Sequence, residues 1–207
     1  MKVLLSAPRA GSSYCYEQIE EENLRLPDVY KPHDKAEFLN PDIKSEWDTA
    51  TKIAWLNSER ELGREYTFKH HINYLQTDQF DYYNTWFINF YKDHQVIILK
   101  RKDIWSWFLS FLFQDFNQWT TAGVSIDDDD YLDTINENWY NRDYRTSLKQ
   151  FYEIKSQLDC CDGNVIYYED LTYVSKTSKK LSLLVDYESY FPNIVEIKQE
   201  FEKYNVC

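Results

Sequence analysis

The chain has 207 residues, which is enough for one well-buried domain and short for two, so we expect a single domain over residues 1–207. Aromatic residues make up 18% of the sequence, which excludes a disordered chain and predicts a core built on large rings. The formal net charge of −12 argues against a protein that coats nucleic acid or an anionic membrane, because its long-range field repels both, although a local basic pocket is compatible with it.

Taken in chain order, the first half alternates between extended and helical patterns. Five stretches are typical of regular structure: extended at residues 3–6 and 65–71, and helical at residues 12–22, 44–62 and 78–94. Residues 24–41 carry several prolines and are expected to form a loop, and Gly63 stands where a helix C-cap is expected.

The second half begins with the clearest strand of the sequence, residues 95–99, whose apolar run is continuous. A helix is expected from about Asp103, and because it is apolar nearly all round it should be largely covered. Further patterns are helical at residues 131–158, extended at 164–168 and helical at 191–204.

Strands that alternate with long helical connections, without hairpin signals, predict an α/β fold of three layers in which helices flank a central, mainly parallel sheet. Ligands in such sheets bind at the carboxyl ends of the strands. The residues that follow each expected strand are therefore the candidates for a ligand-binding site.

The first strand runs into the sequence PRAGSS at residues 8–13. A strand that stops at a small-residue turn and restarts as a helix aims backbone N–H groups and the positive helix end at one point, which suits an anion. The stretch lacks the first glycine and the lysine of the nucleoside-triphosphatase loop, so ATP or GTP hydrolysis is a poor match. The alternative is an ordinary strand-to-helix turn with Ser12 as its N-cap.

The second strand ends in FKHH at residues 68–71. Because side chains alternate along a strand, Lys69 and His71 share one face, and Phe68 and His70 share the other. One face thus offers a cation beside a base that titrates near neutral pH. The alternative is a surface lysine and a histidine that is hydrogen-bonded in a turn.

The third strand is followed directly by three cations, KRK at residues 100–102, in a chain that is otherwise acidic. Arginine carries a fork of N–H donors that suits phosphate oxygens. Ser106 and Ser110 share a face of the next helix, so a hydroxyl can join Arg101 on the same anion. The alternative is a solvated basic turn.

The fourth strand leads into YYEDL at residues 167–171, where a tyrosine can stack on a base, although tyrosine is too common here for this motif to say much alone. No metal site is expected, because the acidic run at residues 127–130 reads as a solvated loop and the four cysteines lack zinc-ligand spacing. A cytoplasmic location is the default expectation, since neither a signal peptide nor a membrane span is apparent.

In this order, the four strand ends resemble the sulfotransferase family, which uses 3′-phosphoadenosine 5′-phosphosulfate (PAPS) and releases adenosine 3′,5′-bisphosphate (PAP). PRAGSS is similar to the family's 5′-phosphosulfate loop P-[RK]-[SA]-G-[ST]-[ST], KHH to its K-x-H strand end, and YEDL at residues 168–171 to its Y-E-D-L segment. Arg101 and Ser110 resemble the pair that holds the 3′-phosphate. The resemblance spans residues 1–175, and in size and low glycine content the chain is most like small bacterial and bacteriophage members.

The resemblance implies a P-loop-like sulfotransferase architecture and in-line transfer of a sulfonate group from PAPS to a hydroxyl or amine, with no metal. It implies that Arg9, Lys69 and His71 are catalytic, with His71 as the general base. It also implies a set of cofactor-binding residues: Arg9, Ala10, Gly11, Ser12, Ser13, Arg101, Ser110 and Tyr168.

Several alternatives stay open. His70 or a carboxylate competes with His71 as the base, and Ser106 competes with Ser110, because the family spacing from arginine to serine is commonly eight. The glycine-rich C-terminal motif of the cytosolic eukaryotic members is absent. A non-catalytic nucleotide-phosphate-binding protein of the same fold is the alternative function, although a pure binder needs no base beside Lys69.

The acceptor is expected to be a small molecule or a glycan, with its pocket shaped by residues 24–41 and 116–130. The negative net charge disfavours a highly anionic polysaccharide as the acceptor. Neither nucleic acid nor a membrane is an expected partner, and the sequence leaves the oligomeric state open.

Overall fold

The computed structural model describes residues 1–19, 49–72, 95–117, 143–171, 188, 191 and 193–204. The chain forms two compact units: the first unit is Met1–Lys102 with Ser156–Lys180, and the second unit is Asp103–Lys155 with Leu181–Cys207. The expectation of one domain over residues 1–207 stays a prediction. The expected loop at 24–41, the helix at 78–94 and the acidic run at 127–130 lie outside the described residues.

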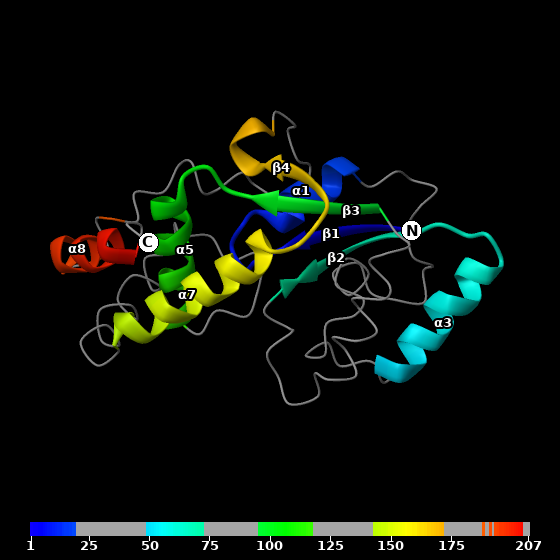
Figure 1. The fold of residues 1–207 in the computed structure, drawn as a ribbon, viewed down its shortest axis with the longest axis horizontal. Helices are drawn as coiled ribbons and strands as arrows, with labels where there is room; N and C mark the ends of the chain where they lie inside the picture. The colour runs from blue at the N-terminus through cyan, green and yellow to red at the C-terminus, as the bar shows by residue number, and fades with distance from the viewer. Residues whose placement is uncertain are drawn as a thin grey trace, which may run out of the picture. The chain divides into compact units, whose positions relative to one another are not determined.

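A sheet of four parallel strands forms the first unit: β1 (Lys2–Ser6), β2 (Thr67–His71), β3 (Gln95–Lys100) and β4 (Asn164–Tyr167). Their order across the sheet is β2-β1-β3-β4, with β1 and β3 in the middle (Figure 1). The predicted α/β class with a parallel sheet is confirmed. The last strand ends one residue earlier than predicted, because Tyr168 opens a short 3-10 helix, η4 (Tyr168–Asp170).

The two central strands are buried as their apolar sequences predict, whereas β4 is an exposed edge. Helices α1 (Ser12–Ile19) and α3 (Thr49–Glu61) lie on opposite faces of the sheet. Phe68 and its register partner Val3 pack in one core cluster with Leu56 of α3. Lys69, the next residue of β2, instead reaches Ser13 of α1, as strand alternation requires.

Helix α3 buries a charged residue among its apolar ones. Ile53, Leu56 and Glu59 are buried, whereas Leu62, just after the helix, is exposed. Glu59 tolerates burial because Tyr66 Oη donates a hydrogen bond to its carboxylate at 2.5 Å and Arg64 donates another at 2.9 Å. The bond from Tyr66, assisted by Arg64, holds the pKa of Glu59 below its ordinary value.

Gly63 ends α3 as predicted. Its φ is +72°, its N–H donates to the Arg60 carbonyl at 2.9 Å, and the N–H of Arg64 donates to the Glu59 carbonyl at 3.0 Å. These two bonds form a Schellman cap, which needs a left-handed residue at this position.

The second unit contains α5 (Ile104–Asn117), most of α7 (Tyr144–Asp159) and α8 (Ile194–Tyr204). Its core is aromatic: the ring of Phe151 lies 5.0 Å from Trp107 and 5.3 Å from Phe108, which stacks on Phe201 at 5.3 Å. The prediction that the apolar helix after Asp103 is largely covered is confirmed.

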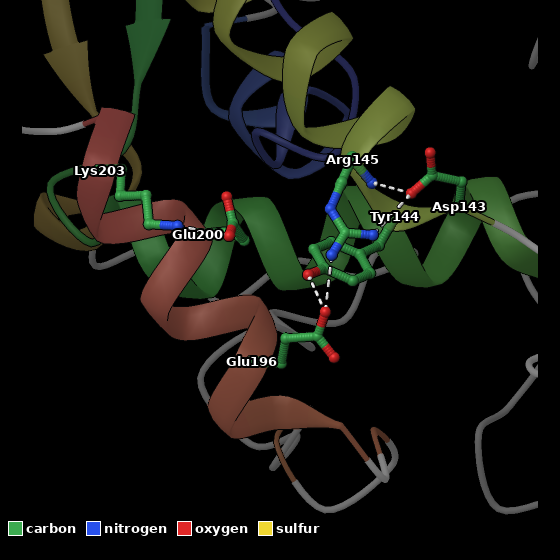
Figure 2. Close-up of polar contacts among 6 residues, drawn as sticks. All are labelled: Asp143, Tyr144, Arg145, Glu196, Glu200 and Lys203. Atoms are coloured by element: carbon green, nitrogen blue, oxygen red, sulfur yellow. Dashed lines mark hydrogen bonds and ion pairs between the residues drawn. The ribbon is translucent and has the colours of Figure 1, made fainter.

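Polar contacts join the start of α7 to α8. Tyr144 Oη and Arg145 Nη2 both donate to one Glu196 oxygen, at 2.9 and 2.7 Å, while Arg145 also pairs with Asp143 (Figure 2). Burial, together with the hydrogen bond to Glu196, raises the pKa of Tyr144 to about 12. Tyr144 therefore stays a proton donor to Glu196 across the physiological range.

No helix within the described part of the chain combines the length and the apolar character needed to cross a membrane.

The burial pattern of α3 yields a paired test. Leu56→Ala removes a side chain that is 0% exposed and is expected to lower the free energy of unfolding by about 2–5 kcal/mol. Leu62→Ala, at a position 66% exposed, should change it by less than about 0.5 kcal/mol. Urea unfolding followed by circular dichroism measures both, and equal losses would contradict the observed orientation of α3.

Candidate functional site

The predicted anion-binding residues of the first unit lie at the point where the strand order reverses. From the neighbouring strands β1 and β3 the sheet grows in opposite directions, to β2 and to β4. Ser6, the last residue of β1, is the register partner of Leu99, so PRAGSS and Arg101 follow the carboxyl ends of adjacent strands. Such a switch point leaves a crevice between the outgoing connections, and ligands of open α/β sheets bind there.

The loop after β1 begins with a tight turn. The N–H of Ala10 donates to the Ala7 carbonyl at 3.3 Å, with Pro8 in second position and Arg9 in third. Arg9 has a φ of +61°, as the third residue of a type II turn requires, and glycine is the usual residue there. The turn leaves the Arg9 side chain exposed at the carboxyl edge of the sheet.

Gly11 is the position of the loop that admits no side chain. Its φ is +88°, and its carbonyl accepts the bond from Cys15 N–H at 3.0 Å that opens α1. A Cβ at this position would lie 2.3 Å from two ring carbons of Tyr168. Glycine is therefore required both by the backbone conformation and by the ring packed on it.

The N-terminus of α1 gathers positive charge. Lys69, buried on β2, donates from Nζ to Ser13 Oγ at 2.8 Å. The free N–H groups of a helix start already carry partial positive charge, and the predicted loop cation Arg9 precedes them. The contact with Ser13 places the ammonium group of Lys69 beside the helix start, an arrangement that suits an anion bound against the loop.

His71 ends β2 on the same face as Lys69, as predicted. Its Nδ1 lies 3.4 Å from Ser6 Oγ and its Nε2 lies 3.5 Å from Ser12 Oγ. His70 belongs to the opposite face, the one that α3 covers, and is completely buried. Of the two candidate bases, His71 is thus the one whose ring reaches the predicted anion loop.

Arg101 is buried, with 2% of its surface exposed, directly after β3. Its guanidinium carbon lies 5.0 Å from the centre of the Tyr168 ring, and Nε lies 3.6 Å from Glu169 Oε1, too far for a hydrogen bond. Within the described residues, neither Nε nor Nη1 has a hydrogen-bond partner. Buried donors without acceptors are costly, so these atoms point to a missing acceptor of the kind that an anionic ligand supplies.

Tyr168 supports both sides of this site. Its buried ring packs on Gly11, meets the ring of Tyr14 edge-on at 5.8 Å and lies next to the Arg101 guanidinium. Its predicted role in stacking on a base stays a prediction. What the ring does in this structure is to fix the spacing between the loop and Arg101.

The two serine candidates on α5 differ in their contacts. Ser106 donates from its backbone N and its Oγ to the carboxylate of Asp103, at 2.9 and 2.6 Å, which makes Asp103 the N-cap of α5. Ser110 is buried on the same helix in the second unit, and its role beside Arg101 stays a prediction.

Two site residues were missed from the sequence. Ser6 ends β1 as the register partner of His71, a position that only the sheet order reveals. Glu169 pairs with Arg101 and accepts the backbone N–H of Lys102 at 2.9 Å. The signal for Glu169 was present in YEDL, where a carboxylate follows a strand that neighbours the one leading to Arg101.

Metal and thiol chemistry have little support in this site. Among the residues that are described, no three histidine, cysteine, aspartate or glutamate side chains converge as metal ligands would. Cys15 on α1 is buried, and burial raises the pKa of its thiol to about 12, so it is protonated and a poor nucleophile at neutral pH.

No protein-family model matches the chain, and neither the curated proteins nor the solved structures give a significant match.

Two glycines with positive φ provide a matched test of the Gly11–Tyr168 contact. Gly63→Ala meets no atom within 4 Å, so it should cost only the left-handed conformation, about 1–2 kcal/mol in the free energy of unfolding. Gly11→Ala has the same backbone cost and also displaces the Tyr168 ring, which lowers the free energy of unfolding by about 1–3 kcal/mol more. Chemical unfolding of both variants gives the difference, and equal losses would show that Tyr168 does not constrain the loop.

Proposed function

We propose that this protein is a PAPS-dependent sulfotransferase that transfers a sulfonate group to a hydroxyl or amine of a small-molecule or glycan acceptor. The observation that carries the proposal is the buried Arg101 beside the switch point of the sheet, whose Nε and Nη1 have no hydrogen-bond acceptor among the residues that the structure describes. A parallel sheet with an anion-suited loop after β1 also supports the P-loop-like architecture that the resemblance implies.

The residues present fit the charge of PAPS, which carries anionic groups at both ends of its ribose. Arg101 is assigned to the 3′-phosphate, with Ser110 as the hydroxyl partner that the resemblance implies. The loop from Arg9 through Ala10, Gly11 and Ser12 to Ser13 is assigned to the 5′-phosphosulfate. PAPS, when bound, supplies the sulfonate group that is transferred.

The side chains at the loop have separate roles in the proposed reaction. Arg9, Lys69 and the N–H groups at the start of α1 stabilise negative charge on the leaving phosphate oxygen. His71 takes the proton from the acceptor hydroxyl or amine at Nε2, the ring nitrogen nearest to Ser12. The acceptor thus gains a bond to sulfur as it loses its proton, while the bond between sulfur and the phosphate oxygen breaks.

The position of Lys69 and His71 on one face of β2 favours an enzyme over a binding protein. A protein that only holds a nucleotide needs the cations but has no use for a base whose ring reaches the anion loop. His71 is favoured over His70 because His70 is buried on the face covered by α3. Glu169, a carboxylate in this part of the site, forms an ion pair with Arg101 and accepts the backbone N–H of Lys102, which disfavours it as the base.

Calorimetric titration with PAP, with ATP and AMP as controls, tests cofactor binding. PAP is expected to bind in preference to both, and Arg101→Gln should weaken it about 10- to 100-fold, since hydrogen bonds to charged groups contribute about 1.5–3 kcal/mol. Lys102→Gln is the matched control: Lys102 is exposed and paired with Asp170, so its loss should change the affinity about twofold or less. Absence of PAP binding, or equal effects of the two variants, would remove the support that Arg101 gives to the proposal.

Replacement of the base separates catalysis from binding. His71→Ala should bind PAP as the wild type does and lose about 10²- to 10⁴-fold in turnover, because a general base contributes that much to rate. Transfer of labelled sulfonate from PAPS to a panel of phenols, amines and sugars measures it. An active His71→Ala enzyme would shift the role to His70 or a carboxylate, and PAP binding without any transfer by the wild type would favour the non-catalytic alternative.

A further inference from the structure

We propose that Ser6 is a positioning residue that holds His71 in the tautomer protonated at Nδ1, which leaves Nε2 as the basic nitrogen. The consequence for catalysis rests on the proposed function, whereas the tautomer itself does not. The register of the sheet sets the completely buried Ser6 directly beside His71.

The His71 ring lies between two hydroxyls. Ser6 Oγ is 3.4 Å from Nδ1, and Ser12 Oγ, at the start of α1, is 3.5 Å from Nε2. A neutral imidazole donates at one nitrogen and accepts at the other, whereas a serine hydroxyl can do either. Geometry alone therefore permits two arrangements, one the reverse of the other.

The charges on the Ser12 side distinguish the two arrangements. Nε2 faces the N-terminal end of α1, where backbone N–H groups carry partial positive charge. The ammonium group of Lys69 is held on the next residue of that helix, with Nζ 2.8 Å from Ser13 Oγ. A lone pair on Nε2 is attracted to this positive end, whereas an N–H there would be repelled. The favoured tautomer donates from Nδ1 to Ser6 Oγ and accepts at Nε2 from Ser12.

This arrangement gives Ser6 a defined effect on the proposed reaction. A base must present a lone pair to the proton that it removes, and in a neutral imidazole only one nitrogen has it. With Ser6 as the acceptor for Nδ1–H, the lone pair lies at Nε2 on the side of the anion loop. Without Ser6, the Nδ1 proton loses the Ser6 acceptor, and the tautomer protonated at Nε2, which cannot act as a base toward the loop, gains population.

Nitrogen NMR of the imidazole tests the tautomer without any substrate. Two-bond correlation spectra of the full ¹⁵N-labelled chain, recorded in alkaline buffer so that the imidazole is neutral, report which nitrogen is protonated. The His71 signals are assigned by their loss in His71→Gln. We expect the wild type to carry the proton on Nδ1, and Ser6→Ala to shift the ratio about fivefold toward Nε2–H, the equivalent of one neutral hydrogen bond.

Two further variants exclude a general effect of altered packing. Ser6→Thr retains a hydroxyl and should keep the wild-type ratio, while Ser147→Ala, which removes a buried serine from the second unit, should leave the His71 signals unmoved. A wild-type proton on Nε2, or an unchanged ratio in Ser6→Ala, would overturn the inference. If Ser6→Thr does not fold, the comparison of Ser6→Ala with Ser147→Ala decides.

A kinetic measurement links the tautomer to the proposed function. Ser6→Ala should lower kcat by the fall in the fraction of the Nδ1–H tautomer, at most about fivefold, and leave the affinity for PAP unchanged, whereas a merely structural role would weaken both. An unchanged kcat would overturn the catalytic part of the inference. If the wild type binds no PAP, the proposed function fails while the NMR result for Ser6 stands by itself.

Discussion

The contact between Gly11 and the ring of Tyr168 is the constraint on which the rest of the site depends. It joins the loop after β1 to the 3-10 helix η4 after β4, two segments of the first unit that lie far apart in the sequence. The same ring lies beside the Arg101 guanidinium, so one aromatic side chain sets the distance from the loop to the buried cation. Because packed aromatic contacts deform little, neither the loop nor Arg101 can shift alone.

The site concentrates positive charge in a chain with a net charge of −12, and the partners of each cation explain how. Lys100 and Lys102, which flank Arg101, form ion pairs with Asp159 and Asp170 at 2.7 and 2.5 Å. Arg101 Nε lies 3.6 Å from a Glu169 oxygen and its guanidinium lies beside the Tyr168 ring, while Lys69 donates to the Ser13 hydroxyl. The two flanking lysines thus meet carboxylates at hydrogen-bonding distance, whereas the contacts of the two buried cations include an aromatic ring and a hydroxyl.

Much of the fold followed from the sequence because its signals are local. The continuous apolar run of β3, the cap at Gly63 and the alternation that separates His71 from His70 each depend on neighbouring residues. The burial of Glu59 did not follow from the sequence, because it depends on the partners Tyr66 and Arg64, which no periodicity shows. The Ser6–His71 pair was not predicted for a similar reason: it depends on which strands are neighbours in the sheet, a tertiary property.

Arg9 adds a different consequence. A left-handed backbone costs an ordinary residue about 1–2 kcal/mol, and glycine would adopt it freely. Glycine at the third position of this turn would therefore favour the folded backbone more than Arg9 does. The turn stores conformational energy at a residue that also brings a long, charged side chain to the carboxyl edge of the sheet, so backbone stability and side-chain chemistry oppose each other within one residue.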